Sequence, residues 1–273
     1  MRIQQLTYFS LAILSGALTA CEGAFGWVYD EVAAEEVLPN VEPEIKETSV
    51  TGQFYVDASD WKMWYYLDFP AAIEKIRKDA SHNINEDIVA LPIPFEPTGD
   101  TETERGNHKR DGQYTYYFDV FNEGITNNHF SGFLPTSAQP EPKQWTIAIH
   151  RNNVRTNGLA AYETTLTDIE EVTEDMCNSI AAWQEDEWSE NEVWDDQSTM
   201  LSCYVPCQGI KVNRVLSSWL TMKIPPMPPA FSMNNHVMLL RMADDTYAAL
   251  QLTDYMSSTG KKCCLTIKYR YPI

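Results

Sequence analysis

Residues 236–271, HVMLLRMADDTYAALQLTDYMSSTGKKCCLTIKYRY, carry the clearest secondary-structure signal in this chain. Apolar runs alternate there with short polar turns such as Ala243-Asp244-Asp245 and Ser258-Thr259-Gly260. The expected strands are His236–Arg241, Tyr247–Leu252 and Cys264–Tyr271. Strands that follow one another about every ten residues, separated by such turns, are typical of antiparallel all-β domains. The stretch therefore predicts an antiparallel β-sheet architecture.

The same pattern extends toward the N-terminus, where aromatic and β-branched residues favour a pleated sheet. Further strands are expected at Gln53–Asp57, Trp61–Phe69, Tyr114–Phe121, Trp145–His150 and Val212–Met222. Helix is expected only in a short segment, Ala71–Lys78, and in part of Ile169–Trp188. We therefore expect a single all-β domain over residues 49–273 with a minor helix.

The first 21 residues are typical of an export signal that ends in a lipid-attachment site. Arg2 precedes the apolar run Leu11–Leu14, which is too short to span a bilayer. Leu18-Thr19-Ala20-Cys21 then resembles a bacterial lipobox, in which the cysteine is acylated. An ordinary secretory signal that happens to contain a cysteine is the alternative. We expect a signal peptide over residues 1–20, a lipidated Cys21 and an acidic tether over residues 21–48.

Composition excludes several classes of protein. The chain has 273 residues, a hydrophobic content of 44% and a net charge of −19. This apolar content is too high for a disordered chain. The acidic surplus argues against nucleic-acid binding, because Lys and Arg supply the affinity for phosphate. It also argues against binding an anionic membrane by charge, so any membrane attachment must be covalent or hydrophobic.

Signatures of the common enzyme classes are missing from the sequence. It lacks His-Glu-x-x-His, Gly-x-Ser-x-Gly, a Walker loop and Gly-x-Gly-x-x-Gly. The acidic run from Glu185 to Asp196 could hold a glycosidase pair or Ca²⁺, but a solvated charged surface explains it more simply. We therefore expect that the protein is not an enzyme.

Beyond Cys21 the cysteines are Cys177, Cys203, Cys207, Cys263 and Cys264, an odd number that leaves at least one thiol unpaired. Cys203 and Cys207 are close enough in sequence for a small disulfide loop. The neighbours Cys263 and Cys264 are expected on opposite faces of a strand and should not pair with each other. A zinc site is the competing interpretation, but Cys-x₃-Cys has no second half at the usual spacing.

Methionine is unevenly distributed, with eight of the ten residues lying between Met176 and Met256. A methionine fills a core, forms an adaptable binding surface, or ligates a soft metal or haem iron through its thioether. Met227 lies in the sequence Ile224-Pro225-Pro226-Met227-Pro228-Pro229. Four prolines stiffen that loop, so Met227 is expected on a rigid, extended mount and not inside a strand.

Several segments in order along the chain resemble one protein family. They are Tyr55-Val56-Asp57-Ala58-Ser59, Trp64-Tyr65-Tyr66, Trp145–Arg151, Val154–Gly158, Leu216–Leu220, Arg241–Asp244, Ala249–Tyr255 and Leu265–Pro272. Together they resemble the HmuY family of haem-binding outer-membrane lipoproteins of the Bacteroidetes. The resemblance covers residues 51–69 and 145–273, and residues 70–143 stand out as an insertion. It implies an all-β, hand-like fold that grips haem between two projecting loops.

The resemblance also implies two axial ligands to the haem iron, supplied by His or Met side chains. The second ligand follows the pair Trp219-Leu220, where Met227 is the soft donor within reach. Met200 is the best candidate for the first ligand, and Met176 is the next choice for that same ligand. His150 is expected to be structural. Trp194, Met222 and Phe231 are expected as apolar walls of the haem site, and Lys223 or Arg241 as the partner of a propionate.

The function that follows is haem capture by a surface lipoprotein of the outer membrane. Its expected partners are haem, host haemoproteins and a TonB-dependent outer-membrane receptor that takes the haem for iron acquisition. Burial and iron coordination must supply the affinity, because an acidic protein does not attract haem by net charge. The alternative is a β-rich surface lipoprotein that binds glycan or another protein and no haem.

Overall fold

The computed structural model describes residues 36–39, 41–46, 48–106, 109–118, 129–196, 198, 204–223 and 229–273. The chain divides into a unit of residues 1–37 and a unit of residues 38–273. Every element below belongs to the second unit. The described strands of that unit pair antiparallel in four sheets, which confirms the all-β fold expected from the sequence.

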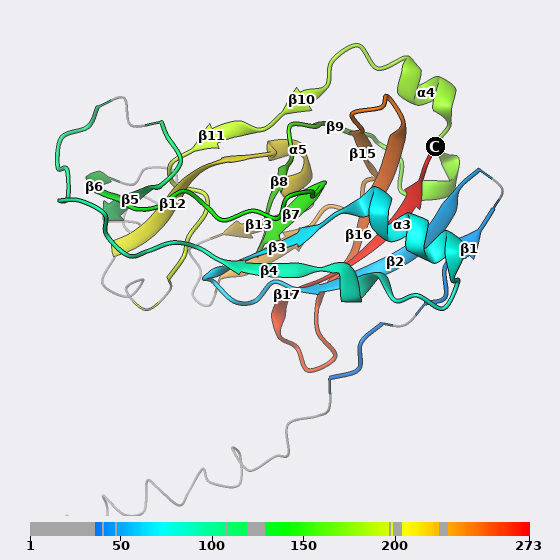
Figure 1. The fold of residues 1–273 in the computed structure, drawn as a ribbon, viewed down its shortest axis with the longest axis horizontal. Coiled ribbons are helices and arrows are strands. Elements are labelled where there is room, and N and C mark those ends of the chain that lie inside the picture. Colours follow the sequence, from blue (N-terminus) through cyan, green and yellow to red (C-terminus); the bar gives the residue numbers. More distant parts are fainter. Residues whose placement is uncertain are drawn as a thin grey trace, which may run out of the picture. The chain divides into compact units, whose positions relative to one another are not determined.

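The largest sheet is built around the three strands expected from residues 236–271 (Figure 1). In spatial order its strands are β1 (Glu44–Ile45), β2 (Val50–Asp57), β17 (Lys262–Tyr271), β16 (Tyr247–Met256), β15 (Met238–Arg241), β9 (Ala160–Glu163) and β10 (Gln184–Glu185). Strand β17 pairs with β2 along its length, from Cys264 opposite Asp57 to Tyr271 opposite Val50. Strand β1 lies within the stretch 21–48 that was expected to be a tether, and pairs with the start of β2.

The remaining described strands form two smaller sheets and one separate hairpin. One sheet has the order β4 (Val89–Pro92), β3 (Met63–Leu67), β7 (Ile147–His150), β8 (Asn153–Thr156), and another the order β11 (Glu187–Ser189), β12 (Tyr204–Val212), β5 (Gln113–Phe118), β6 (His129–Pro135). The hairpin joins β13 (Leu220–Lys223) to β14 (Ala230–Met233). Strands β4, β5 and β6 all come from residues 70–143, so the expected insertion supplies strands to two of the sheets.

Helices are short and few in the described residues: α3 (Phe69–Lys78), η1 (Ile84–Asp87), η3 (Ile169–Glu171), α4 (Glu174–Asn178) and α5 (Arg214–Ser217). Helix α3 begins after Asp68, whose side chain accepts the N–H of Ala71, and Pro70 favours the first turn. It confirms the minor helix expected at Ala71–Lys78. In the described part of the chain, no helix combines the length and apolar character that crossing a membrane requires.

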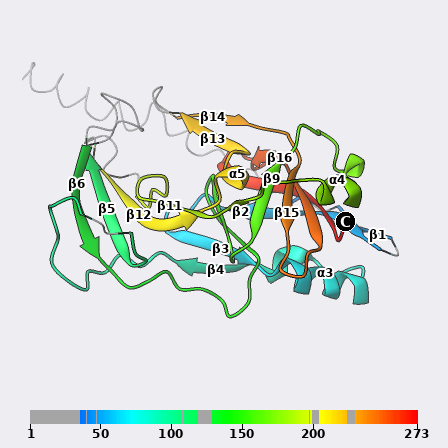
Figure 2. The same cartoon turned by 90° about the horizontal axis from the view of Figure 1, so that it is seen from above.

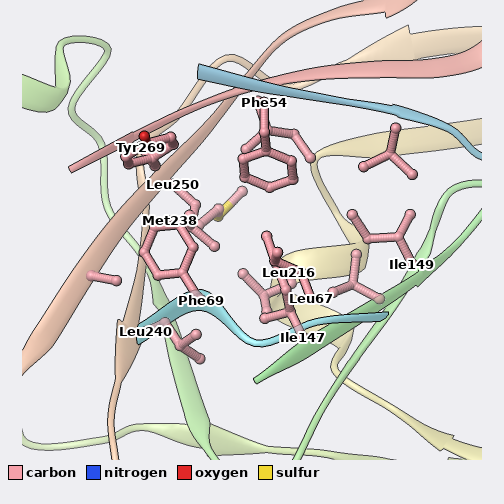
Figure 3. Packing of buried hydrophobic residues seen from close by; sticks show 14 of the residues in the cluster. Phe54, Leu67, Phe69, Ile147, Ile149, Leu216, Met238, Leu240, Leu250 and Tyr269 are labelled. Atoms are coloured by element: carbon pink, nitrogen blue, oxygen red, sulfur yellow. The ribbon is translucent and has the colours of Figure 1, made fainter. Parts of the chain in front are cut away.

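The main core lies between the seven-stranded sheet, α3 and the β3–β7 sheet, as Figure 3 shows. The aromatic rings of Phe69 and Tyr269 meet edge to face at 5.1 Å, and Phe54 lies 6.5 Å from Phe69. Such aromatic pairs contribute about 0.5–1.5 kcal/mol beyond the burial of their area. The core thus fixes α3 on one side of the domain, opposite the β13–β14 hairpin (Figure 2).

Two sequence expectations are wrong. Val212–Met222 is not one strand, because β12 ends at Val212, α5 follows, and β13 begins at Leu220. Asn213 causes the break, since its buried side chain accepts the N–H of Leu216 and caps α5. The second error is the Cys203–Cys207 disulfide, since Cys207 is a buried free thiol in β12. Cys203 lies outside the described residues.

Candidate functional site

The β13–β14 hairpin is one half of the candidate site. Leu220 pairs with Met233 and Met222 with Phe231, so Met222 and Phe231 lie opposite each other across the hairpin. A backbone bond from Asn234 N to Trp219 O, 2.8 Å long, closes its base. Met227, the expected second iron ligand, belongs to the tip and lies outside the described residues. The hairpin therefore mounts the tip on a defined base.

The other half is the loop that leads into strand β12. Backbone bonds from Asp195 N to Pro206 O at 3.3 Å and from Gln208 N to Val193 O at 2.8 Å close this loop at its base. Met200, the expected first ligand, lies within the loop and outside the described residues. Trp194 lies at the closed base, where its indole N–H donates to the carbonyl of Asn191 at 3.0 Å.

These two bases meet in one apolar cluster. Trp194, Val205 and Cys207 form its buried centre, and Met222 packs against it from the hairpin. Trp194 is only 2% exposed, so its indole belongs to the protein interior. The structure therefore brings together two of the three expected wall residues, Trp194 and Met222, from segments far apart in the sequence.

Phe231, the third expected wall residue, packs differently. Its ring stacks on Tyr255 of β16, with ring centres 5.9 Å apart and an interplanar angle of 22°. The ammonium nitrogen of Lys262 also lies 5.0 Å from the centre of the Phe231 ring. Phe231 thus fastens the hairpin to the β16–β17 pair.

Trp61 and Phe130 also pack against the Trp194 cluster, and the sequence did not single them out. The guanidinium of Arg151 lies 3.6 Å from the centre of the Trp61 ring, and His150 Nε2 donates to the Trp61 carbonyl at 2.8 Å. Trp61 was assigned to an expected strand, but it lies before β3, so the alternation of side chains along that strand does not predict where it packs. The useful signal was the dipeptide His150-Arg151, whose side chains both contact residues 59–61.

His150 is a structural residue, as expected. It is fully buried in β7, and its ring lies 5.3 Å from that of Trp64. Because a carbonyl accepts the bond from Nε2, this nitrogen carries the proton and Nδ1 does not. Burial lowers the pKa of His150 to about 4, so the imidazole is neutral at physiological pH.

One carboxylate holds both ends of the hairpin. Glu163, at the end of β9, accepts hydrogen bonds from Asn234 Nδ2 at 2.7 Å and His236 Nδ1 at 2.8 Å on the exit side. It accepts another from Ser218 Oγ at 3.4 Å on the entry side. Burial tends to raise the pKa of Glu163, but these hydrogen bonds outweigh it and hold the pKa below its usual range. Glu163 therefore roots the hairpin as an ionised group.

A groove of about 610 Å³ adjoins the hairpin along β13, a size within the range of ligand sites. Its walls are Asn152, Asn153, Asn191, Glu192, Arg214, Ser217, Ser218, Leu220, Thr221 and Met222. The guanidinium of Arg214 in this groove pairs with Glu192 at 2.6 Å and with Glu187 at 3.1 Å. Most of its lining residues are polar, and Leu220 and Met222 provide its apolar side.

Other expected residues lie elsewhere. Arg241, one of two residues expected to meet a propionate, lies 5.7 Å over the Trp183 ring, in a part of the fold away from the Trp194 cluster. Met176 lies in α4, next to Cys177, which packs in the cluster of Val237, Leu239 and Tyr247. Lys223 is exposed at the end of β13, beside the hairpin tip.

The acidic run from Glu185 to Asp196 contains a structural carboxylate. Asp186 accepts bonds from the amide and hydroxyl of Thr156 at 2.7 and 2.8 Å, and from Asn213 Nδ2 at 3.1 Å. Burial raises the pKa of Asp186 even though these bonds oppose the shift. The part of the chain that the structure describes contains no group of three His, Cys, Asp or Glu side chains placed to hold a metal ion.

Comparison with known proteins gives one consistent family. The family model of HmuY proteins matches residues 60–269. A protein of Bacteroides vulgatus described as an HmuY-like haem-binding protein has 25% identity and a TM-score of 0.56, over 87% of this chain and 99% of its own.

Two further structures have the same fold. A protein of Bacteroides fragilis described as a lipoprotein has 25% identity and a TM-score of 0.54, over 84% of this chain and 92% of its own. The apo form of an HmuY analogue of Tannerella forsythia has 19% identity and a TM-score of 0.56, over 84% of this chain and 99% of its own. No curated protein matches the chain.

Proposed function

This chain belongs to the HmuY family, and on that premise we propose that it binds haem at the surface of the outer membrane and passes it to a receptor. The family and the HmuY-like haem-binding neighbour support the haem-binding role. The role is binding and not catalysis.

The proposed axial ligands are the thioethers of Met200 and Met227. The observation that carries this proposal is the contact of Met222 with the Trp194 cluster, because each residue lies at the base of one ligand-bearing loop. Two loops that share a base can present their tips to the two faces of one flat ligand. Met222 and Phe231 then supply apolar surface near the porphyrin, and the buried Trp194 supports the shared base.

The chemistry of sulfur makes this ligation recognisable. A thioether does not protonate in the ordinary pH range and prefers ferrous to ferric iron. Haem should therefore bind more tightly after reduction, with little dependence on pH. A pair of imidazole ligands would lose affinity as the rings take up protons.

The N-terminal features complete the proposal. Cleavage after residue 20 leaves Cys21 as the lipidated first residue, an acidic tether to about residue 48 and a haem-binding domain over residues 49–273. The Bacteroides fragilis neighbour described as a lipoprotein supports this anchoring. Host haemoproteins are the proposed haem source, and a TonB-dependent outer-membrane receptor is the proposed acceptor.

The test is a haemin difference spectrum of the full chain in detergent, with and without dithionite. Wild-type protein should give a Soret band and bind ferrous haem more tightly than ferric haem. A Met200→Ala/Met227→Ala variant should lose the low-spin spectrum. The matched control is Met233→Ala/Met256→Ala, which removes two other methionines, 37% and 40% exposed, and should leave the spectrum unchanged.

Two outcomes would contradict the proposal at different levels. An unchanged spectrum in the Met200→Ala/Met227→Ala variant would remove bis-methionine ligation and leave haem binding intact. The absence of any Soret band with wild-type protein would remove haem binding altogether, and would favour a surface lipoprotein for glycan or protein.

A further inference from the structure

Haem presents two carboxylates at one edge, and a local cation would offset their repulsion by a protein with a net charge of −19. Two cations near the hairpin already have acidic partners. Arg214 pairs with Glu187 and Glu192, and Lys261 Nζ donates to Asp57 at 2.5 Å. These groups are therefore neutralised within the protein.

Lys262 differs, because no carboxylate pairs with it among the described residues. Its Nζ donates to the carbonyl of Pro229, 2.9 Å away, and lies 5.0 Å from the centre of the Phe231 ring. Pro229 is two residues from Met227 in the sequence. The half-buried Lys262 side chain therefore ends at Pro229, the first described residue after the tip in the sequence, and beside Phe231, an expected wall of the haem site.

The ammonium group retains capacity for another ligand. It has three N–H donors, of which the Pro229 carbonyl accepts one, and a ring face attracts the cation without accepting a conventional hydrogen bond. The Phe231 ring and the Pro229 carbonyl hold Lys262 in one place, whereas Lys223 is exposed at the end of β13. A held cation loses less conformational entropy when it binds an anion.

We propose that Lys262 is the residue that binds a propionate carboxylate of haem, and so makes the site specific for porphyrins with free acids. This rests on the proposed haem-binding function. It replaces Arg241, which lies over Trp183, as the cation for the propionate.

The experiment compares haemin with haemin dimethyl ester, in which both carboxylates are blocked, on the full chain in detergent. Lys262→Met should weaken haemin binding about fivefold to tenfold, the range for a partly exposed ion pair with a hydrogen bond. Binding of the dimethyl ester should change less than about twofold. Lys262→Arg retains charge and donors and should restore most of the haemin affinity.

Two controls separate the carboxylate from other effects. Lys211→Met removes an exposed lysine of β12 and should leave both affinities unchanged. Thermal unfolding of each variant verifies the fold. If Lys262→Met weakens both ligands equally, Lys262 acts only by fastening Pro229, and the proposal is overturned.

An unchanged haemin affinity in Lys262→Met would also overturn it. If wild-type protein binds neither ligand, the proposed function itself fails, and the assignment of Lys262 fails with it. If wild-type protein binds both ligands equally tightly, haem binding stands but recognition of the propionate does not.

Discussion

Acidification should destabilise the native protein through the imidazole of His150. Its Nε2 donates to the carbonyl of Trp61 at 2.8 Å, and its buried Nδ1 has no partner in the described structure. A second proton would have to go to Nδ1, in a fully buried position next to the guanidinium of Arg151. The native fold therefore resists protonation, whereas the unfolded chain accepts the proton freely.

The size of the effect follows from the two pKa values. Burial lowers the pKa of His150 from 6.5 to about 4. Between these values the unfolded state binds more protons than the native state, so stability decreases as the pH falls through this window. Each pKa unit corresponds to about 1.4 kcal/mol, which makes the loss about 3 kcal/mol by pH 4. For a domain of this size that is a decrease in Tm of roughly 6–12 °C.

The assay is urea unfolding, followed by tryptophan fluorescence between pH 7 and pH 4, for wild-type protein and for His150→Gln. The glutamine amide can still donate to Trp61 but does not titrate. Other titrating groups are common to both proteins, so the difference between their unfolding free energies isolates His150. Wild-type protein should be the more stable at pH 7, and the difference should shrink by about 3 kcal/mol toward pH 4.

A difference that stays constant over this pH range would refute the buried, neutral imidazole. The same variant tests the structural assignment in another way. Because His150 is enclosed by β-sheet and bonded to Trp61, His150→Gln should retain the haem spectrum. Loss of the Soret band in a folded variant would instead identify His150 as an iron ligand.

Two further predictions concern carboxylates whose pKa values shift in opposite directions. Glu163→Gln should reduce stability at pH 7 by about 1 kcal/mol, because a third of the side chain is exposed and solvent weakens its hydrogen bonds. The pKa of Glu163 is below its usual 4.5, so the difference from wild type should disappear in urea titrations as the pH falls below that value, and a difference that persists in acid would contradict it. Asp186→Asn should cost about 1–2 kcal/mol at pH 7, because the new amide NH₂ faces a hydrogen-bond donor of Thr156 or Asn213. In wild-type protein the carboxyl carbon of Asp186 should titrate by NMR above the usual 3.8, so this group adds stability as the pH falls, and a midpoint below 3.8 would contradict its burial.

The sheet architecture could be predicted from the sequence because apolar runs and turns repeat locally. Residues 236–271 fold into three neighbouring strands, β15, β16 and β17, close to the expected bounds. The family could also be recognised, because its segments keep their order along the chain. Both signals can be read along the sequence without knowledge of any long-range contact.

Long-range contacts were harder to predict. The break at Asn213 depends on a side chain that caps α5 while its amide donates to Gln184 and Asp186, residues about 28 positions away in the sequence. Trp61 joins the Trp194 cluster because His150 and Arg151 hold its segment from another strand pair. The local sequence pattern around Asn213 or Trp61 does not reveal these distant partners.

The iron ligands themselves were proposed by resemblance and by the chemistry of sulfur. The structure adds the arrangement of the described residues: the base of each loop, the carboxylate of Glu163 that holds the hairpin, and the lysine bonded to Pro229. None of these three features has a sequence motif, because each joins residues from different strands.

The thiols in the described structure have one practical consequence. Cys177, Cys207, Cys263 and Cys264 are free and buried, and burial raises the pKa of Cys177 and Cys264 to about 11. In the native protein these four thiols therefore present almost no thiolate to an alkylating reagent at neutral pH. When the interior opens locally, these thiols become reactive, so the rate of alkylation reports how often the core opens. A ligand that binds the native state should lower that rate.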